Sequence, residues 1–246
     1  MPRANRYFLP GYVWHLTHRC HKQEYLLKFA RDRRNWVKWL YKARKRYGLC
    51  VLNYMVTSNH IHLLVKDTGQ DVIPRSMQLI ASRTAQDYNQ RKKRKGAFWE
   101  DRYHATAVQA ETHLLRCLTY IDLNMVRAGV VSHPQEWKYC GYHEIHSPRS
   151  RYRIVDLVAL MELLEISNTH QLSTMYQGCI KEALHQRLEV LQHDTCWTQS
   201  VAVGNKEFIE RVKYQLGSRS KGRSSIKLKF GYQLKEPQIL YLVKQA

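Results

Sequence analysis

The chain has 246 residues, and 40 Lys and Arg against 20 Asp and Glu give it a formal net charge of +20. A surface this basic favours a polyanionic partner, above all nucleic acid, because binding to phosphates releases condensed counterions. No apolar run approaches the roughly 20 residues that a membrane-spanning helix needs, and residues 1–15 lack the apolar stretch of a signal peptide. These features exclude a membrane protein and predict a cytoplasmic one.

The first 130 residues alternate between short runs with strand periodicity and longer runs with helical periodicity. We predict strands at 13–20, 50–56 and 61–65, an extended segment at 98–108, and helices at 28–47, 76–90 and 111–127. This order predicts an α+β fold on the split βαβ theme. We therefore expect a ferredoxin-like palm, an antiparallel sheet covered by helices, in residues 1–146.

The pattern changes after the polar stretch 147–150. Residues 151–217 have mostly helical spacing, which predicts a mainly helical C-terminal extension with DNA binding as a candidate role. Residues 218–225 consist of Ser, Arg, Lys and Gly only, so we expect a basic linker and tail over 218–246.

The first candidate site lies in the run Asn59 to Val65, which contains the predicted strand 61–65. Side chains on a strand alternate between faces, so His60 and His62 point to one side and Ile61 and Leu63 to the other. Two imidazoles on one face can bind one divalent cation. The pair alone does not distinguish metal ligands from buried hydrogen-bonding histidines.

The second candidate site lies on the predicted helix 111–127. At about 100° per residue, five residues form one stripe on its surface: His113, Arg116, Tyr120, Asn124 and Arg127. The apolar residues fall in a separate stripe, so we expect the helix to bury that stripe and to present Tyr120 on the other side.

A tyrosine hydroxyl that attacks a phosphodiester needs the charge of the phosphate to be neutralised. A divalent ion on His60, His62 and the amide oxygen of Asn124 would supply this as a Lewis acid. Mixed nitrogen and oxygen ligands suit Mg²⁺ or Mn²⁺, although histidines also accept Zn²⁺, so the identity of the metal stays open. The general base also stays open among a metal-bound water, His113 and Glu100.

Basic residues interleaved with aromatic ones are typical of grooves that bind single-stranded nucleic acid. A solvated helix face is the competing interpretation of each such segment. The candidate DNA-contacting residues are Arg91, Lys92, Lys93, Arg94, Lys95, Trp99, Arg102, Arg116 and Arg127.

Four possible zinc ligands also lie close together in the sequence, at His15, His18, Cys20 and His21. A regular strand sends His18 and Cys20 to one face and His15 and His21 to the other, so we reject a metal site built from all four.

Three motifs in order carry a family resemblance: Asn59-His60-Ile61-His62-Leu63-Leu64-Val65, then Phe98-Trp99-Glu100-Asp101-Arg102-Tyr103, then Tyr120-Ile121-Asp122-Leu123-Asn124 with Val126-Arg127-Ala128-Gly129-Val130. Together they resemble the REP-associated tyrosine transposases, which belong to the single-tyrosine, His-hydrophobic-His, IS200-like superfamily. The resemblance spans roughly Arg6 to Tyr142.

The resemblance implies a ferredoxin-like fold, His60 and His62 as metal ligands, Asn124 as the third ligand and Tyr120 as the nucleophile. It implies a 5′-phosphotyrosine intermediate and a free 3′-hydroxyl, formed on single-stranded or hairpin DNA at palindromic elements by a monomer or a homodimer. The sequence departs from these relatives at Met125, where they usually have Pro, and at Cys140-Gly141, where they have Ser-Ser.

Two other functions remain open. A replication-initiator or relaxase-type nickase shares the paired histidines and the tyrosine, but it would act at a plasmid or phage origin. A non-catalytic nucleic-acid-binding protein would keep the fold and the charge without the chemistry.

Overall fold

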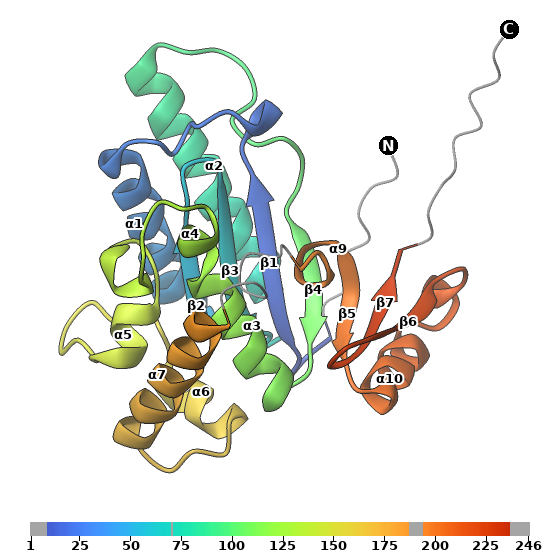
Figure 1. Cartoon of the computed structure of the whole chain (residues 1–246). Helices are drawn as coiled ribbons and strands as arrows, with labels where there is room; N and C mark the ends of the chain where they lie inside the picture. The colour runs from blue at the N-terminus through green and yellow to red at the C-terminus, as the bar shows by residue number, and fades with distance from the viewer. Residues whose placement is uncertain (1–8, 70, 187–193, 237–246) are drawn as a thin grey trace, which may run out of the picture.

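A computed structural model describes residues 9–69, 71–186 and 194–236 of the chain (Figure 1). Residues 1–8 of the predicted catalytic domain, 187–193 of the extension and 237–246 of the tail lie outside these ranges. The first part of the chain folds, in order, as β1 (Val13–Arg19), α1 (Ala30–Tyr47), β2 (Cys50–Val56), β3 (His60–Lys66), α2 (Val72–Lys92), β4 (His104–Val108), α3 (Thr112–Asp122) and α4 (Asn124–Arg127).

Four strands form the antiparallel centre of the sheet. β1 pairs antiparallel with both β3 and β4, and β3 pairs antiparallel with β2, which gives the order β2-β3-β1-β4. The two outer strands thus each follow a helix crossover past a central strand, which is the split βαβ arrangement. The predicted α+β class and ferredoxin-like palm are confirmed.

Strand alternation divides the side chains of β1 and β3 between two faces of this sheet. The register pairs Thr17 with His62 and His15 with Leu64, so His15, His60 and His62 all lie on one face, here called the His62 face. Figure 1 shows α3 and α4 in front of the strands and α2 behind them. The His62 face is the one that α3 covers.

The helix predicted at 111–127 is interrupted. α3 ends at Asp122, Leu123 adopts φ −79° and ψ 3°, and the short α4 begins at Asn124. The break leaves Tyr120 and Asn124 on the same side of the chain, because the two helices follow one another directly.

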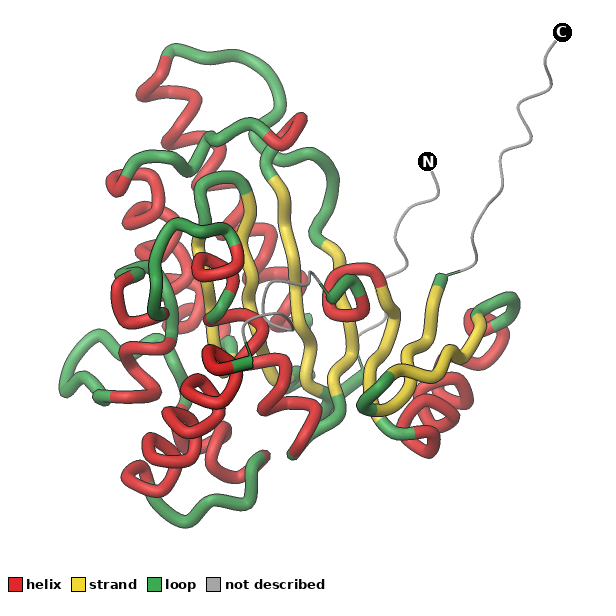
Figure 2. The backbone as a smooth tube through the Cα atoms, viewed as in Figure 1, coloured by secondary structure: helices red, strands yellow, loops and turns green. Residues whose placement is uncertain are grey.

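The second part of the chain adds helices and three more strands. It folds as α5 (Tyr142–His146), α6 (Leu157–Leu163), α7 (Thr169–His185), α9 (Cys196–Gln199), β5 (Ser200–Gly204), α10 (Lys206–Leu216), β6 (Ser224–Leu228) and β7 (Gly231–Lys235). β5 pairs parallel with β4, and β7 and β6 follow, so the described residues form one mixed sheet of seven strands (Figure 2).

Within the described residues, the extension 151–217 is mainly helical, as expected, because α6, α7, α9 and α10 accompany the single strand β5. The expectation of a linker after it was wrong. Residues 218–236, expected as a linker, contain the β6–β7 hairpin. Its apolar residues do alternate, from Ile226 and Leu228 to Tyr232 and Leu234, but the surrounding Lys, Arg and Ser residues obscured this period of two.

Within the ranges given above, no helix is both long enough and apolar enough to cross a bilayer.

Candidate active site

Three side chains converge above the His62 face. The Nε2 atoms of His60 and His62 lie 3.1 Å apart, and the amide nitrogen of Asn124 lies 3.0 Å from Nε2 of His62. β3 supplies the two histidines as alternate residues, and α4 supplies Asn124 at its first residue. The predicted metal ligands therefore meet at one point.

The donor set and its spacing fit a small divalent ion. Ligands of an octahedral ion at about 2.1 Å that subtend a right angle are about 3 Å apart. This matches the distances from Nε2 of His62 to His60 and to Asn124. The nitrogen and oxygen of an amide are assigned rather than observed, so rotation of the Asn124 amide presents its oxygen at the same place. The described parts of the chain contain no group of three or more His, Cys, Asp and Glu residues that could hold a metal. The third side chain that meets the two histidines is the amide of Asn124.

The remaining nitrogen of each histidine is also held. Nδ1 of His60 lies 2.7 Å from Oδ1 of Asn59 and 3.0 Å from Oγ1 of Thr57, both in the turn before β3. Nδ1 of His62 lies 2.9 Å from Nε2 of His15, a fully buried residue of β1. These contacts fix the orientation of both rings.

The part that His15 plays in this site was missed from the sequence. Strand alternation separates His15 from His18, as expected, but it does not give the register between β1 and β3. Only that register places His15 diagonally beside His62. Burial lowers the pKa of His15 to about 3, so its imidazole is neutral.

Tyr120 lies beside the three converging side chains. Its ring stands edge-on to the ring of His62, with centroids 5.9 Å apart, and the guanidinium of Arg127 lies 4.2 Å from its centroid. Burial raises the pKa of Tyr120 to about 12, although the neighbouring charge of Arg127 opposes that shift.

The side of α3 that carries Tyr120 is buried as well. Tyr120 is only 6% exposed and Asn124 9%, because the C-terminal part of the chain packs over this side of the helix. The Trp197 ring lies 6.2 Å from that of Tyr120 and stacks on Phe230, and the Phe230 carbonyl accepts a hydrogen bond from Nε2 of His113. Nε2 of His113 therefore bonds to Phe230 and not toward the ring of Tyr120.

The comparisons with known proteins agree with this geometry. Residues 11–124 match the family model described as "Transposase IS200 like". The chain carries an IS200-like transposase domain. The matched residues include the three converging side chains, His60, His62 and Asn124, and Tyr120 beside them.

One solved structure similar to this chain is that of a REP-associated tyrosine transposase bound to a REP hairpin. It is 18% identical with a TM-score of 0.51, over 63% of this chain and 90% of that one, and it shares the fold of the transposase domain. A structure of a candidate transposase from Deinococcus radiodurans R1 is 17% identical with a TM-score of 0.35, over 51% of this chain and 90% of that one. No curated protein sequence matches the chain.

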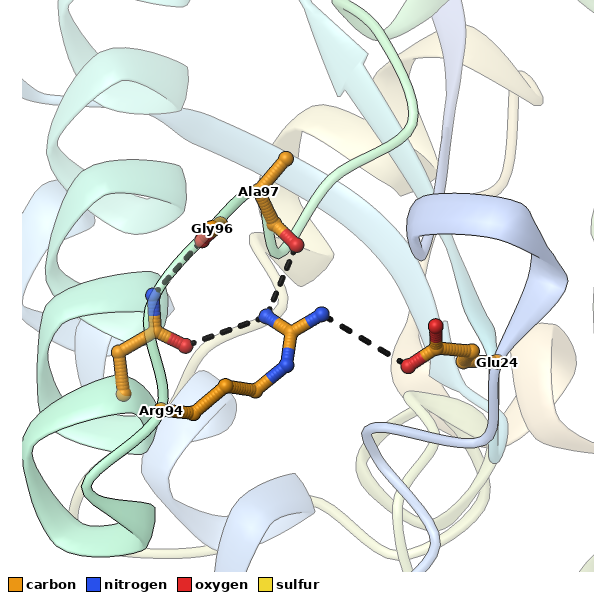
Figure 3. Close-up of polar contacts among 5 residues, drawn as sticks. Glu24, Arg94, Gly96 and Ala97 are labelled. Atoms are coloured by element: carbon orange, nitrogen blue, oxygen red, sulfur yellow. Dashed lines mark hydrogen bonds and ion pairs between the residues drawn. The ribbon is translucent and has the colours of Figure 1, made fainter.

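The basic run of the transposase domain follows the end of α2. Lys92, Lys93 and Lys95 are exposed, whereas Arg91 pairs with the buried carboxylate of Asp32. Arg94 donates 2.9 Å to the Ala97 carbonyl and lies 3.7 Å from the Glu24 carboxylate, so it braces the loop that Figure 3 shows.

The other candidate DNA-contacting residues are dispersed. Trp99 stacks on His18 with centroids 4.1 Å apart and donates to the Ala81 carbonyl of α2, so its ring takes part in packing. Arg102 is exposed, and Arg116 is exposed with its guanidinium 5.1 Å from the Phe230 ring. Arg127 belongs to the surroundings of Tyr120.

A groove of about 700 Å³ runs between α1 and α2 of the transposase domain. Its charged lining residues are four basic ones, Arg31, Arg34, Lys38 and Arg91, and two acidic ones, Asp32 and Asp87. The exposed lysines at the end of α2 directly follow Arg91, so the groove and the basic run form one positively charged surface, here called the α1–α2 surface.

Proposed function

We propose that this protein is a metal-dependent transposase that cleaves and rejoins single-stranded DNA at hairpin or palindromic repeat elements, with Tyr120 as the nucleophile. The observation that carries the proposal is the meeting of His60, His62 and Asn124 at one point beside the Tyr120 ring. A nucleophile next to a cation site is what phosphodiester cleavage by tyrosine requires.

Mg²⁺ or Mn²⁺ would be held by Nε2 of His60, Nε2 of His62 and the amide oxygen of Asn124. When bound there, the ion supplies a Lewis acid that neutralises the oxygens of the scissile phosphate.

The protein residues carry the covalent step. The Tyr120 hydroxyl loses its proton and attacks the phosphorus, and the bond from phosphorus to the 3′ oxygen breaks. The released 3′ oxygen takes up a proton, and the 5′ phosphate stays on Tyr120. Rejoining reverses the exchange, because a 3′-hydroxyl attacks the phosphotyrosine and releases the tyrosine. The positive charge of Arg127 beside the ring favours the phenolate.

The DNA partner follows from charge. The α1–α2 surface has the density of cations that phosphate backbones favour, and the similar structure named above contains a hairpin. We assign backbone contacts to this surface and to Arg102 and Arg116. In this proposal residues 1–146 form the catalytic domain, and the extension 151–217 supports it.

The test is covalent capture. The full-length protein is incubated with Mn²⁺ and a single-stranded oligonucleotide that carries a hairpin, and adducts are separated under denaturing conditions. We expect an adduct with wild type and with Tyr214→Phe, an exposed control. We expect none with Tyr120→Phe, with His60→Ala and His62→Ala combined, or after chelation.

Other outcomes would identify the other functions. An adduct of equal yield from Tyr120→Phe would disprove the assigned nucleophile. Preferred cleavage of a plasmid or phage origin would indicate an initiator or relaxase. Unchanged DNA affinity and cellular effect in the variant that lacks His60, His62 and Tyr120 would indicate a non-catalytic binding protein.

The same assay separates a monomer from a homodimer that exchanges catalytic helices. His60→Ala and Tyr120→Phe are inactive alone in either arrangement. An adduct that reappears when the two variants are mixed would mean that the tyrosine of one subunit acts at the metal site of another.

A further inference from the structure

We infer that His15 is a positioning residue, held by the Trp197 carbonyl, that keeps His62 in the tautomer whose Nε2 can bind a metal. The inference rests on the metal site of the proposed function. It adds a residue and a segment of the C-terminal region that the family match at 11–124 does not assign, since Trp197 lies outside that range.

The geometry is a chain of hydrogen bonds that runs from α9 to the metal site. Nδ1 of His15 lies 2.7 Å from the Trp197 carbonyl oxygen, and Nε2 of His15 lies 2.9 Å from Nδ1 of His62. Nε2 of His62 then faces His60 and Asn124. The rings of His15 and His62 are nearly parallel, at 11°, with centroids 5.1 Å apart.

The direction of each hydrogen bond follows from the groups involved. A carbonyl oxygen only accepts, so Nδ1 of His15 carries the hydrogen. His15 is fully buried, and its hydrogen-bond partners among the described residues include no carboxylate, so the ring is neutral and its Nε2 accepts. Nδ1 of His62 must then donate. A neutral His62 with its hydrogen on Nδ1 presents a lone pair at Nε2, as a metal ligand requires.

The carbonyl that begins this chain is itself fixed. Oγ1 of Thr106, opposite His15 in β4, donates to the Trp197 carbonyl at 3.2 Å and to the Ser200 carbonyl at 2.7 Å. α9 and the start of β5 are thereby attached to the catalytic sheet at the level of His15. The C-terminal strands thus extend the sheet, and the segment that leads into them, α9 and the start of β5, orients a metal ligand.

A neighbouring histidine offers a matched control. His104 of β4 lies on the same face as His15, and its Nε2 hydrogen-bonds the Ser200 carbonyl at 2.9 Å. Burial lowers the pKa of His104 as it lowers that of His15. His104 therefore resembles His15 in bonding to the C-terminal segment, although its side chain is only partly buried, and its hydrogen bond leads to that segment alone.

The first test measures binding of Mn²⁺ alone to full-length protein, by electron paramagnetic resonance of the free ion. Loss of an outer partner of a metal-binding histidine typically weakens binding by about 10–100-fold, and we expect this for His15→Phe. His15→Gln, whose amide oxygen can accept from His62, should recover part of the loss. His104→Gln should bind like wild type. Equal losses in His15→Phe and His104→Gln, or no loss in a folded His15→Phe, would overturn the inference.

The second test needs no metal and no variant. Nitrogen-15 correlation spectra of the histidine side chains in metal-free wild type should show His62 with its hydrogen on Nδ1. A hydrogen on Nε2 would overturn the positioning role. Absence of Mn²⁺ binding and of the DNA adduct in a wild type with the expected tautomer would instead overturn the proposed function, so the two failures are distinguishable.

Discussion

The Arg127 guanidinium lies 4.2 Å from the centroid of the Tyr120 ring and also donates to the Tyr120 carbonyl oxygen. The contact crosses the break at Leu123, so one side chain both connects α4 to the last turn of α3 and brings a positive charge to the ring of Tyr120. Burial lowers the pKa of Arg127, and the neighbouring Tyr120 opposes that shift.

The first prediction concerns this pair. Because burial holds the pKa of Tyr120 at about 12, only a small fraction is phenolate at neutral pH. Single-turnover cleavage should rise about tenfold per pH unit from roughly pH 6 to pH 9. Arg127→Gln removes the positive charge that lowers the pKa of Tyr120, so that pKa should rise further. Cleavage should then be about tenfold slower for each unit by which the pKa increases. Rates are measured at saturating DNA. Arg151→Gln, at an exposed arginine outside the proposed DNA contacts, should keep the wild-type rate, and a wild-type rate for Arg127→Gln would refute the assignment.

The second prediction concerns the buried Asp122, two residues after Tyr120. Its carboxylate accepts from the Tyr176 hydroxyl of α7 at 2.5 Å and from the Asn53 amide of β2 at 3.1 Å, and burial raises its pKa to about 7. The unfolded carboxyl ionises near pH 4, so between pH 4 and 7 the folded state binds more protons. The contribution of Asp122 to the free energy of unfolding should therefore fall as pH rises from 4 to 7, by at most about 1.4 kcal/mol for each pH unit.

Urea unfolding of wild type and Asp122→Asn at several pH values measures this contribution. The asparagine cannot ionise, so the stability of the variant relative to wild type should increase from pH 4 to pH 7 and then level off. Parallel curves for the two proteins would mean that Asp122 does not retain its proton on folding.

Much of the catalytic half could be predicted from the sequence because its signals are local. The His-x-His alternation needs only the two-residue period of a strand. The stripe of Tyr120 and Asn124 needs only the helical period, and it survived the break at Leu123 because α4 continues at once. The helix end at Gly48 was also local, since that residue adopts φ 71°.

The features that could not be predicted from the sequence depend on contacts between distant segments. The burial of Tyr120 depends on Trp197, and the orientation of His62 on a strand register that pairs Thr17 with it. The β6–β7 hairpin was hidden by its basic residues. In each case the deciding partner lies far away in the chain, beyond the reach of periodicity.

The third prediction uses a position where this chain departs from its relatives. A β carbon on Gly141 would lie 2.2 Å from Oδ1 of Asn53, although the backbone there, at φ −76°, suits any residue. Gly141→Ser, which restores the relatives' residue, should displace Asn53 from Asp122 and destabilise the protein by about 1–3 kcal/mol. Urea unfolding measures the loss.

A double-mutant cycle isolates the cause of that loss. In an Asn53→Ala background the clash is absent, so Gly141→Ser should be less destabilising there than in wild type. Gly178→Ala in α7, where a β carbon meets nothing within 4 Å, should be neutral or stabilising by up to about 1 kcal/mol. Additive effects of Asn53→Ala and Gly141→Ser would show that Asn53 is not the obstacle.

The fourth prediction concerns the docking of the β6–β7 hairpin on the catalytic helix. Gly231 has φ 147°, and a β carbon there would lie 2.6 Å from Nε2 of His113 and 2.7 Å from the Gly204 carbonyl oxygen. Gly231→Ala therefore adds backbone strain to a clash on two sides, and we expect a loss of about 2–5 kcal/mol in urea unfolding. Gly48→Ala, at a left-handed position with φ 71° and nothing within 4 Å, carries strain alone and should lower the free energy of unfolding by only about 1–2 kcal/mol. Hydrogen exchange should locate the extra loss of Gly231→Ala in β7 and in α3 near His113. Equal losses in the two variants, with no faster exchange in α3, would mean that the hairpin does not support the helix that carries Tyr120.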